Sequence, residues 1–282
     1  MDTEPTSTPT RSVKSSVGPS NVSSYLDPLY WDKRFSSEEH YEWLKDYSHF
    51  RHLIQLYIKP ISPTSVLELG CGNSQLGEEL HRDGITGLTC IDLSAVAVDN
   101  MQKRLLSKGI KVMSLNMLLK FKFYGAPMFC ISYDYIQVLV ADMLDLPFEK
   151  ESFDVVIEKG TMDVVFVDSG DPWNPRPETV KKAMAMLQGV HRVLKPDGVF
   201  VSISFGQPHF RRPLFEAPEF SWSIEWKTFG DGFHYFFYIL KKGRRMTDSK
   251  PCMEKSDRPS ISLYQEELED ENYMFRTNVE EL

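Results

Sequence analysis

The sequence predicts a doubly wound α/β fold with a mostly parallel sheet of seven strands. Between residues 65 and 205, short apolar runs alternate with amphipathic segments, and this alternation is typical of parallel strands joined by helices. A glycine-rich turn, GCG at 70–72, joins the first apolar run to the first helix of the alternation. The last two apolar runs flank a Gly-Asp-Gly turn, which predicts a C-terminal antiparallel hairpin.

The individual elements follow from local patterns in chain order. Residues 25–59 carry aromatic side chains at helical spacing, so we expect helix ahead of the sheet. Ser94 is a suitable N-cap and Gly109 a suitable stop for the helix between them, and Lys-Pro-Asp-Gly is expected to end a later one. Parallel strands are predicted at 65–69, 87–92, from 138, at 152–160 and at 198–205, helices at 73–84, 94–109 and 177–198, and antiparallel strands at 221–230 and 233–243.

Length and composition predict one domain with two polar tails. The chain has 282 residues, of which 41% are hydrophobic, and its net charge is −8. Residues 1–24 are rich in Pro and Ser and are predicted to be disordered. Residues 246–282 contain ten acidic and four basic side chains and are predicted to form an acidic, solvated tail. The domain itself is predicted to span 25–245.

The composition also argues against several functional classes. The middle of the chain is close to neutral, so we expect no direct nucleic-acid binding. The apolar runs are far shorter than a membrane span, and we expect no secretory signal at the N-terminus. The four cysteines show neither a CxxC pair nor metal-ligand spacing, and we see no His/Cys metal set. We therefore expect free thiols, no bound metal and a cytoplasmic location, whereas the oligomeric state is not predicted.

The glycine turn and the acids after the strands predict a nucleoside-type ligand, although a turn without a ligand is the simpler alternative. The turn lacks the third glycine of a dinucleotide fingerprint, and Glu68 before it fits an ammonium and a sulfonium better than a pyrophosphate. Asp92 ends the second strand, where a carboxylate accepts hydrogen bonds from ribose hydroxyls or simply precedes a helix. Asp142 could accept from the adenine amine or cap a turn. NAD and S-adenosylmethionine share this ribose, so Asp92 does not distinguish them.

The spacing between Asp92 and Asp142 is longer than the fold requires. Asp142 lies fifty positions after Asp92, and the residues between them include an apolar, aromatic stretch at 112–137, which matches neither a solvated loop nor a further βα unit. We interpret 112–137 as an atypical in-frame insertion, arising from alternative splicing or a gene-model error. A constitutive exon that encodes this stretch would contradict the hypothesis.

Four motifs in a fixed order resemble the class I (seven-β-strand) S-adenosylmethionine-dependent methyltransferases: LELGCGNSQLGEEL, CIDLS, ADMLDLPFEKESFDVVIEKGTMD and VLKPDGVFVSISF. YWDKRF, YEWLKDYSHFRHLI and GDGFHYFFYILKKG add a narrower resemblance to the elongation factor 1A lysine methyltransferase 4 type. The resemblance covers residues 25–243. It implies a Rossmann-like methyltransferase fold with S-adenosyl-L-methionine as the cofactor.

The resemblance also implies roles for individual residues. Three aromatic residues would close over the cofactor, a glycine would lie under its methionine part, two pairs would hold the ribose and the adenine, and a lysine would contact it from a strand end. The aromatic residues are Trp31, Phe35 and Trp43, and the glycine is Gly70. The ribose pair is Asp92 with Leu93, the adenine pair is Asp142 with Met143, and the lysine is Lys159. The family commonly has tyrosine where this chain has phenylalanine at position 35, so a hydroxyl contact is missing there.

Methyl transfer to lysine requires a neutral amine. Because the ordinary pKa of lysine is near 10.4, only about one amine in a thousand is neutral near pH 7.4, a cost of roughly 4 kcal/mol. A dry aromatic channel would lower that cost, and Glu158 and Asp163 are the candidate catalytic carboxylates that would orient the amine. Aromatic residues of the stretch 232–238 would line the entrance.

Three functions remain open from the sequence. The first is a protein-lysine N-methyltransferase that acts on a protein substrate, a translation elongation factor of the 1A type. The second is a small-molecule methyltransferase, because the fold alone does not separate these substrates. The third is an inactive cofactor-binding or interaction protein, if the segment 112–137 disrupts the central sheet.

Overall fold

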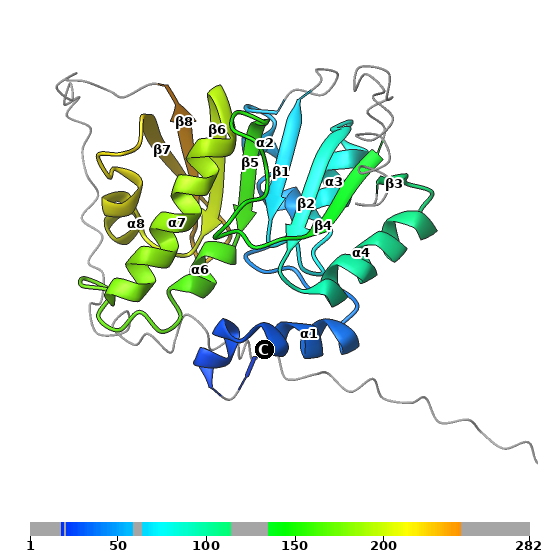
Figure 1. Cartoon of the computed structure of the whole chain (residues 1–282), viewed down its shortest axis with the longest axis horizontal. Coiled ribbons are helices and arrows are strands. Elements are labelled where there is room, and N and C mark those ends of the chain that lie inside the picture. Colours follow the sequence, from blue (N-terminus) through cyan, green and yellow to red (C-terminus); the bar gives the residue numbers. More distant parts are fainter. Residues whose placement is uncertain (1–17, 20, 59–63, 114–134, 244–282) are drawn as a thin grey trace, which may run out of the picture.

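The computed structural model describes residues 18–19, 21–58, 64–113 and 135–243, and it confirms the predicted α/β architecture. One eight-stranded, mostly parallel sheet forms its centre, with strand order β3-β4-β2-β1-β5-β6-β8-β7 (Figure 1). Only β8 pairs in antiparallel fashion, with β6 on one side and β7 on the other, as the hairpin prediction required. The strands are β1 Ser65–Leu69, β2 Gly87–Asp92, β3 Val112–Met113, β4 Tyr135–Val140, β5 Phe153–Lys159, β6 Leu194–Ser204, β7 Trp222–Phe229 and β8 Tyr235–Lys242.

Helices cover both faces of the sheet, and α1 lies beneath its lower edge in Figure 1. Buried apolar side chains of α2, α3 and α4 contribute to the core on one face, and those of α6, α7 and α8 contribute to the core on the other. Among the described residues, no helix is long and apolar enough to cross a membrane. The helices are η1 Val22–Leu26, α1 Pro28–Ser37, η2 Tyr47–His49, α2 Arg51–Ile54, α3 Leu76–Arg82, α4 Ala95–Ser107, α6 Thr161–Val165, α7 Pro177–Val193 and α8 Pro208–Phe215.

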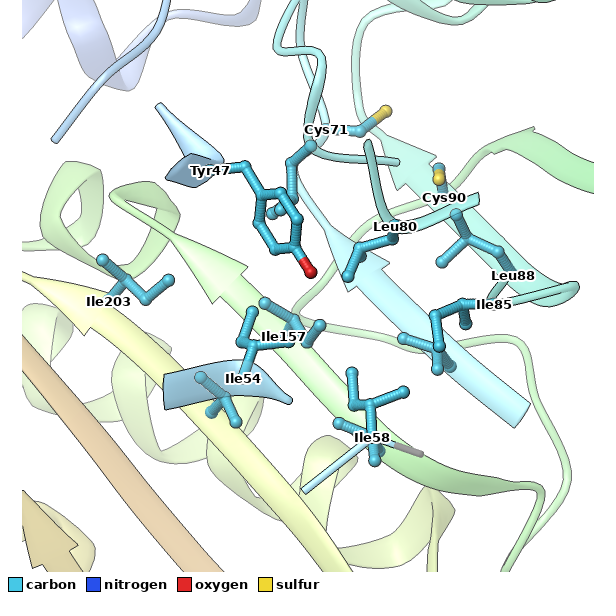
Figure 2. Packing of buried hydrophobic residues seen from close by; sticks show 14 of the residues in the cluster. Tyr47, Ile54, Ile58, Cys71, Leu80, Ile85, Leu88, Cys90, Ile157 and Ile203 are labelled. Atoms are coloured by element: carbon cyan, nitrogen blue, oxygen red, sulfur yellow. The ribbon is translucent and has the colours of Figure 1, made fainter. Parts of the chain in front are cut away.

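The two faces of the sheet bury separate apolar cores. On the first face, Tyr47, Ile54 and Ile58 from the segment ahead of β1 pack toward Ile157 and Ile203 of the central strands (Figure 2). This packing explains the helical spacing of the aromatic residues at 43–57, although only the short elements η2 and α2 form there, whereas Pro28–Ser37 forms the longer helix α1. The central strands read as continuous apolar runs because both of their faces are covered.

The first core also contains two of the four cysteines. Cys71 and Cys90 are free thiols and are buried, as expected for core positions (Figure 2). Burial raises the pKa of both thiols, so they remain protonated and unreactive at neutral pH. The other two cysteines lie outside the described residues.

The sheet differs from the prediction in strand number and in the limits of the insertion. It has eight strands rather than seven, because Val112–Met113 pairs with β4 as a short edge strand. Residues 135–137 belong to β4 and pair with β2, so both ends of the proposed insertion 112–137 lie in the sheet. Its interior, 114–134, lies outside the described residues.

Two further boundaries differ from the prediction, one of a helix and one of the N-terminal tail. The predicted helix at 177–198 ends at Val193, because Leu194 is fully buried and already pairs with Phe153 as the first residue of β6. Residues 22–24, which we expected within the disordered tail, form the start of η1. The rest of that tail up to residue 17, and the acidic tail at 246–282, lie outside the described residues.

The segment ahead of the sheet should contribute to the free energy of unfolding of the domain. Phe50 is fully buried and contacts the rings of Phe229 and Phe237, whereas nearby Leu56 is 59% exposed. We expect Phe50→Ala to lower the free energy of unfolding by about 3–5 kcal/mol, because it leaves a cavity between these rings. Urea unfolding followed by circular dichroism measures this loss. The control Leu56→Ala should cost less than about 1 kcal/mol, and equal effects of the two variants would contradict the assignment.

Candidate active site

A cavity of about 320 Å³ opens at the carboxyl edge of the parallel strands. Its walls come from the turns after β1, β2, β4 and β5 and from the segment that precedes the sheet. The register brings these turns together, because Leu69 at the end of β1 pairs with Ile91 on one side and Glu158 on the other. Ligands of open α/β sheets bind at this edge. All nine positions at which we predicted cofactor contacts line the cavity.

The glycine turn is held tightly between its neighbours. Gly70 and Gly72 have φ angles of +64° and +48°, which side chains with a Cβ adopt only with strain. A Cβ on Gly70 would also lie 2.4 Å from the side chain of Thr161, whose Oγ1 donates to the carbonyl of Leu69 at 3.0 Å. The turn therefore needs glycine for both backbone conformation and space, and its backbone faces the cavity.

Asp92 connects the glycine turn to the next helix. Its Oδ2 accepts the N–H of Gly72 at 2.8 Å, and its Oδ1 accepts the N–H of Ser94 at 2.8 Å. Ser94 is the N-cap of α4, so the helix-start role considered for this acid is present in the structure. Burial raises the pKa of Asp92. Each carboxylate oxygen keeps acceptor capacity toward the cavity, which a ribose hydroxyl could use.

Glu68 is a buried carboxylate in the cavity wall. Its Oε2 accepts a hydrogen bond from the thiol of Cys90 at 3.2 Å, and burial raises its pKa to about 7. The charge of Lys159 acts in the opposite direction and lowers this pKa. A cationic ligand in the cavity would stabilise the ionised form of Glu68.

Lys159 also lines the cavity, at the end of β5, the strand that pairs with β1. Its side chain is only 5% exposed, and its Nζ donates to Glu42 Oε2 at 2.8 Å and to the carbonyl of Trp43 at 2.7 Å. Glu42 also accepts the N–H of Gln75 at 2.6 Å and the hydroxyl of Ser74 at 2.8 Å. One carboxylate therefore ties the segment ahead of the sheet to β5 and to the glycine turn.

Aromatic side chains from that same segment cover the cavity. Trp31 stacks on Phe35 with ring centroids 5.6 Å apart, and its indole N–H donates to the carbonyl of Tyr25 at 2.8 Å. Phe35 is buried and lies against the glycine turn, where a Cβ on Gly72 would approach its ring to 3.2 Å. A phenylalanine fits this apolar contact without needing a hydroxyl.

Asp142 and Met143 form the wall after β4. Asp142 is exposed, and its Oδ1 accepts the N–H of Leu144 at 2.8 Å, which is the turn contact that we considered as the alternative. Its second oxygen has capacity for an amine donor. Met143 is half-buried and offers an apolar surface beside it.

The two predicted catalytic carboxylates differ in position. Glu158 does not line the cavity: it is fully buried, and its oxygens accept the N–H groups of Thr161 and Met162 at 3.0 Å and the hydroxyl of Ser202. These contacts hold the start of α6. Burial, followed by the nearby charge of Asp163, raises the pKa of Glu158 to about 7.

Asp163 does line the cavity, but it is also an anchor for α8. Its Oδ1 accepts from Arg211 at 2.6 Å and from the hydroxyl of Ser204 at 2.5 Å. The ion pair is buried, with both side chains about 5% exposed or less. A carboxylate held in this way is well placed to orient a group, while its charge is already balanced.

Sequence reasoning missed several cavity residues and their partners. Glu42, Tyr25 and Tyr41 lie among the aromatic residues ahead of the sheet, where no motif sets them apart, and only the two tyrosines line the cavity directly. No sequence motif marked Arg211 either, because its partner Asp163 lies 48 positions earlier in the chain. The cavity wall does not include the stretch 232–238 that we expected at the entrance.

The cavity walls suit a cationic nucleoside ligand. Ion pairs balance Lys159 with Glu42 and Asp163 with Arg211. The carboxylates of three further lining residues instead accept from backbone N–H groups or a thiol, and these are Glu68, Asp92 and Asp142. In the described part of the chain, no group of three or more His, Cys, Asp or Glu side chains is arranged to hold a metal ion.

Comparisons with known proteins identify the family of the chain. The family model described as a methyltransferase domain matches residues 67–202. The chain is 34% identical over 232 residues to EEF1A lysine methyltransferase 4 of Mus musculus, covering 80% of this chain and 79% of that protein. It is 32% identical over 229 residues to the Bos taurus protein of the same name, covering 79% of this chain and 78% of that one.

Solved structures share the fold at low sequence identity. The PH0226 protein from Pyrococcus horikoshii OT3 matches with a TM-score of 0.51 at 14% identity, over 74% of this chain and 98% of that one. This likeness supports the doubly wound architecture alone. Taken with the two relatives above, the domain match shows that the chain belongs to the S-adenosylmethionine-dependent methyltransferases, in the family that includes EEF1A lysine methyltransferase 4.

Proposed function

We propose that this protein is a protein-lysine N-methyltransferase whose substrate is a translation elongation factor of the 1A type. The observation that carries the proposal is the 34% identity to the mouse relative over 232 residues, a span much longer than the shared methyltransferase domain at 67–202. The similarity therefore includes segments outside the general cofactor-binding core. A substrate of this kind implies action in the cytoplasm, where translation elongation takes place.

The cavity residues fit S-adenosylmethionine part by part. We propose that Glu68 faces its ammonium or sulfonium group, that the backbone of Gly70 supports its methionine part, and that Asp92 with Leu93 holds its ribose. Asp142 with Met143 would hold the adenine, and three aromatic side chains would cover the bound cofactor, namely Trp31, Phe35 and Trp43. Support comes from the lining of the cavity and from the acceptor oxygens directed at it.

When bound, the cofactor supplies a methyl group that is already activated by the sulfonium charge. The remaining task of the protein is to place a neutral lysine amine in line with that group and to exclude water. The apolar side of the cavity, which includes Val164, Val165 and Phe205, would disfavour the charged form of the incoming amine.

Asp163 is our candidate for orienting that amine, because it reaches the cavity from the start of α6. Its ion pair with Arg211 fixes the direction of the carboxylate. Glu158 lies behind the wall, and we propose that it acts as a positioning residue by holding α6.

The proposal predicts transfer of a labelled methyl group from S-adenosylmethionine to lysine in elongation factor 1A. We expect the full chain to label factor produced in bacteria, with methyl-lysine recovered after acid hydrolysis. Label in extracted metabolites without label in protein would instead support a small-molecule substrate. Cofactor binding without transfer to any acceptor would support an inactive protein.

Replacement of Asp92 should weaken cofactor binding. Asp92→Ala removes two acceptor oxygens, and since charge-assisted hydrogen bonds contribute about 1.5–3 kcal/mol each, we expect at least a tenfold higher Kd. Isothermal titration with S-adenosylmethionine measures the change. The control Asp99→Ala removes an exposed acid of α4, which pairs only with Lys103 in the next turn, and should leave the Kd unchanged. A similar Kd for Asp92→Ala and wild type would contradict the ribose role.

Glu68 should make cofactor binding depend on pH. Because its pKa is about 7 in the free protein, it is ionised above pH 7 and attracts a cation there, and it becomes neutral below. If the neutral form does not bind, the Kd rises by about tenfold between pH 8 and pH 6. We expect Glu68→Gln to remove most of this dependence when both proteins are titrated in parallel. Identical pH profiles would show that Glu68 is not the group responsible.

A further inference from the structure

A lysine side chain lines the cavity that we propose for a positively charged ligand. Lys159 lines the wall, and its side chain is only 5% exposed. S-adenosylmethionine carries a sulfonium and an ammonium against one carboxylate, so its net charge is +1 near neutral pH. In a partly dry cavity, two such charges repel each other more strongly than in water.

Glu42 balances Lys159 from behind the wall. Its carboxylate is 14% exposed, and its Oε2 lies 2.8 Å from Lys159 Nζ. It is also fixed in place by the N–H of Gln75 and the hydroxyl of Ser74, so the pair does not depend on a bound ligand for its geometry. Glu42 does not line the cavity, so it would act on the ligand without contact, chiefly by offsetting the charge of Lys159.

The charges of this pair act on the neighbouring strand β1. Lys159 lowers the pKa of Glu68 and Glu42 raises it, so both charges act on a carboxylate that itself lines the cavity. Glu68 also feels Arg104 and bonds to the thiol of Cys90, but neither of these groups pairs with Lys159. The balance between the lysine and its carboxylate partner therefore sets part of the potential at the ligand.

We infer that Glu42 is a specificity-determining positioning residue, which neutralises Lys159 so that the cavity prefers the sulfonium cofactor to its thioether product. The inference rests on the proposed function, in which this cavity holds S-adenosylmethionine. S-adenosylhomocysteine has lost the sulfonium charge, so its net charge is zero and it feels the lysine less. With Lys159 neutralised, the cavity does not repel the charged cofactor. The neutralisation does not strengthen binding of the uncharged product that remains after methyl transfer.

The experiment compares the Kd values of the two ligands by isothermal titration of the full chain. We expect Glu42→Gln to raise the Kd of S-adenosylmethionine about tenfold more than that of S-adenosylhomocysteine, because it leaves the lysine unbalanced. Lys159→Met should shift the ratio of the two Kd values in the opposite direction, and the double variant should return it toward the wild-type value. Glu39→Gln, an exposed acid in the same segment, is the matched control and should leave the ratio unchanged.

A purely structural link predicts a different pattern. If Glu42 only holds the segment ahead of the sheet, Glu42→Gln weakens both ligands by the same factor, and that result would overturn the inference. Glu42→Asp keeps the charge with a shorter side chain, so we expect it to keep the wild-type ratio even where it weakens both ligands. Should Glu42→Gln fail to fold, Lys159→Met alone decides, since an unchanged ratio there overturns the inference. Wild-type protein that binds neither ligand would instead overturn the proposed function.

Discussion

The parallel pairing of β1 with both β2 and β5 fixes where three turns leave the sheet. Hydrogen bonds then join these turns to one another: the N–H of Cys71 donates to the carbonyl of Ile91, and the N–H of Gly72 donates to Asp92. Thr161, after β5, donates back to the last residue of β1. A slip of one residue in this register would exchange the faces of a strand and break all of these contacts. The site therefore depends on the same pairing that forms the core.

The segment ahead of the sheet completes what the strands cannot provide. Strand ends supply backbone donors and carboxylates, but the aromatic cover comes from residues 25–44, which contact the glycine turn through polar groups. Asn73 donates to both the backbone and the side chain of Glu38, and Arg34 lies 5.0 Å from the rings of Tyr41 and Trp43. Because these polar groups are partly buried and paired, separating the segment from the sheet would leave several of them without partners.

Local patterns predicted the strands that carry the site but not the contacts that join them. The strands at 65–69 and 87–92 have the predicted limits, because each is an apolar run bounded by turn residues. The helix end at Val193 was not predictable from Lys-Pro-Asp-Gly, since the burial of Leu194 against β5 ends the helix earlier. Positions that line the cavity were predictable where a turn follows a strand.

Long-range partners were outside the reach of sequence patterns. Lys159 and Glu42 are 117 positions apart, and the partner of Asp163 is 48 positions away, so neither ion pair leaves a periodic or motif signal. The short strand β3 was missed for a related reason, because two residues carry no alternation and their pairing with β4 depends on the neighbouring sheet. Most local elements could therefore be predicted from the sequence, whereas the tertiary pairing between them could not.

The link between Glu42 and Lys159 also has a consequence for how the protein is made. The aromatic segment leaves the ribosome before its partners, because those in the glycine turn follow Glu42 by about thirty positions and Lys159 follows it by 117. Loop closure over such a separation must be completed before the contact stabilises anything. During synthesis, the first strands of the sheet can thus pair before the aromatic segment has all of its contacts available. The cavity is then assembled late, when most of the domain has already been translated.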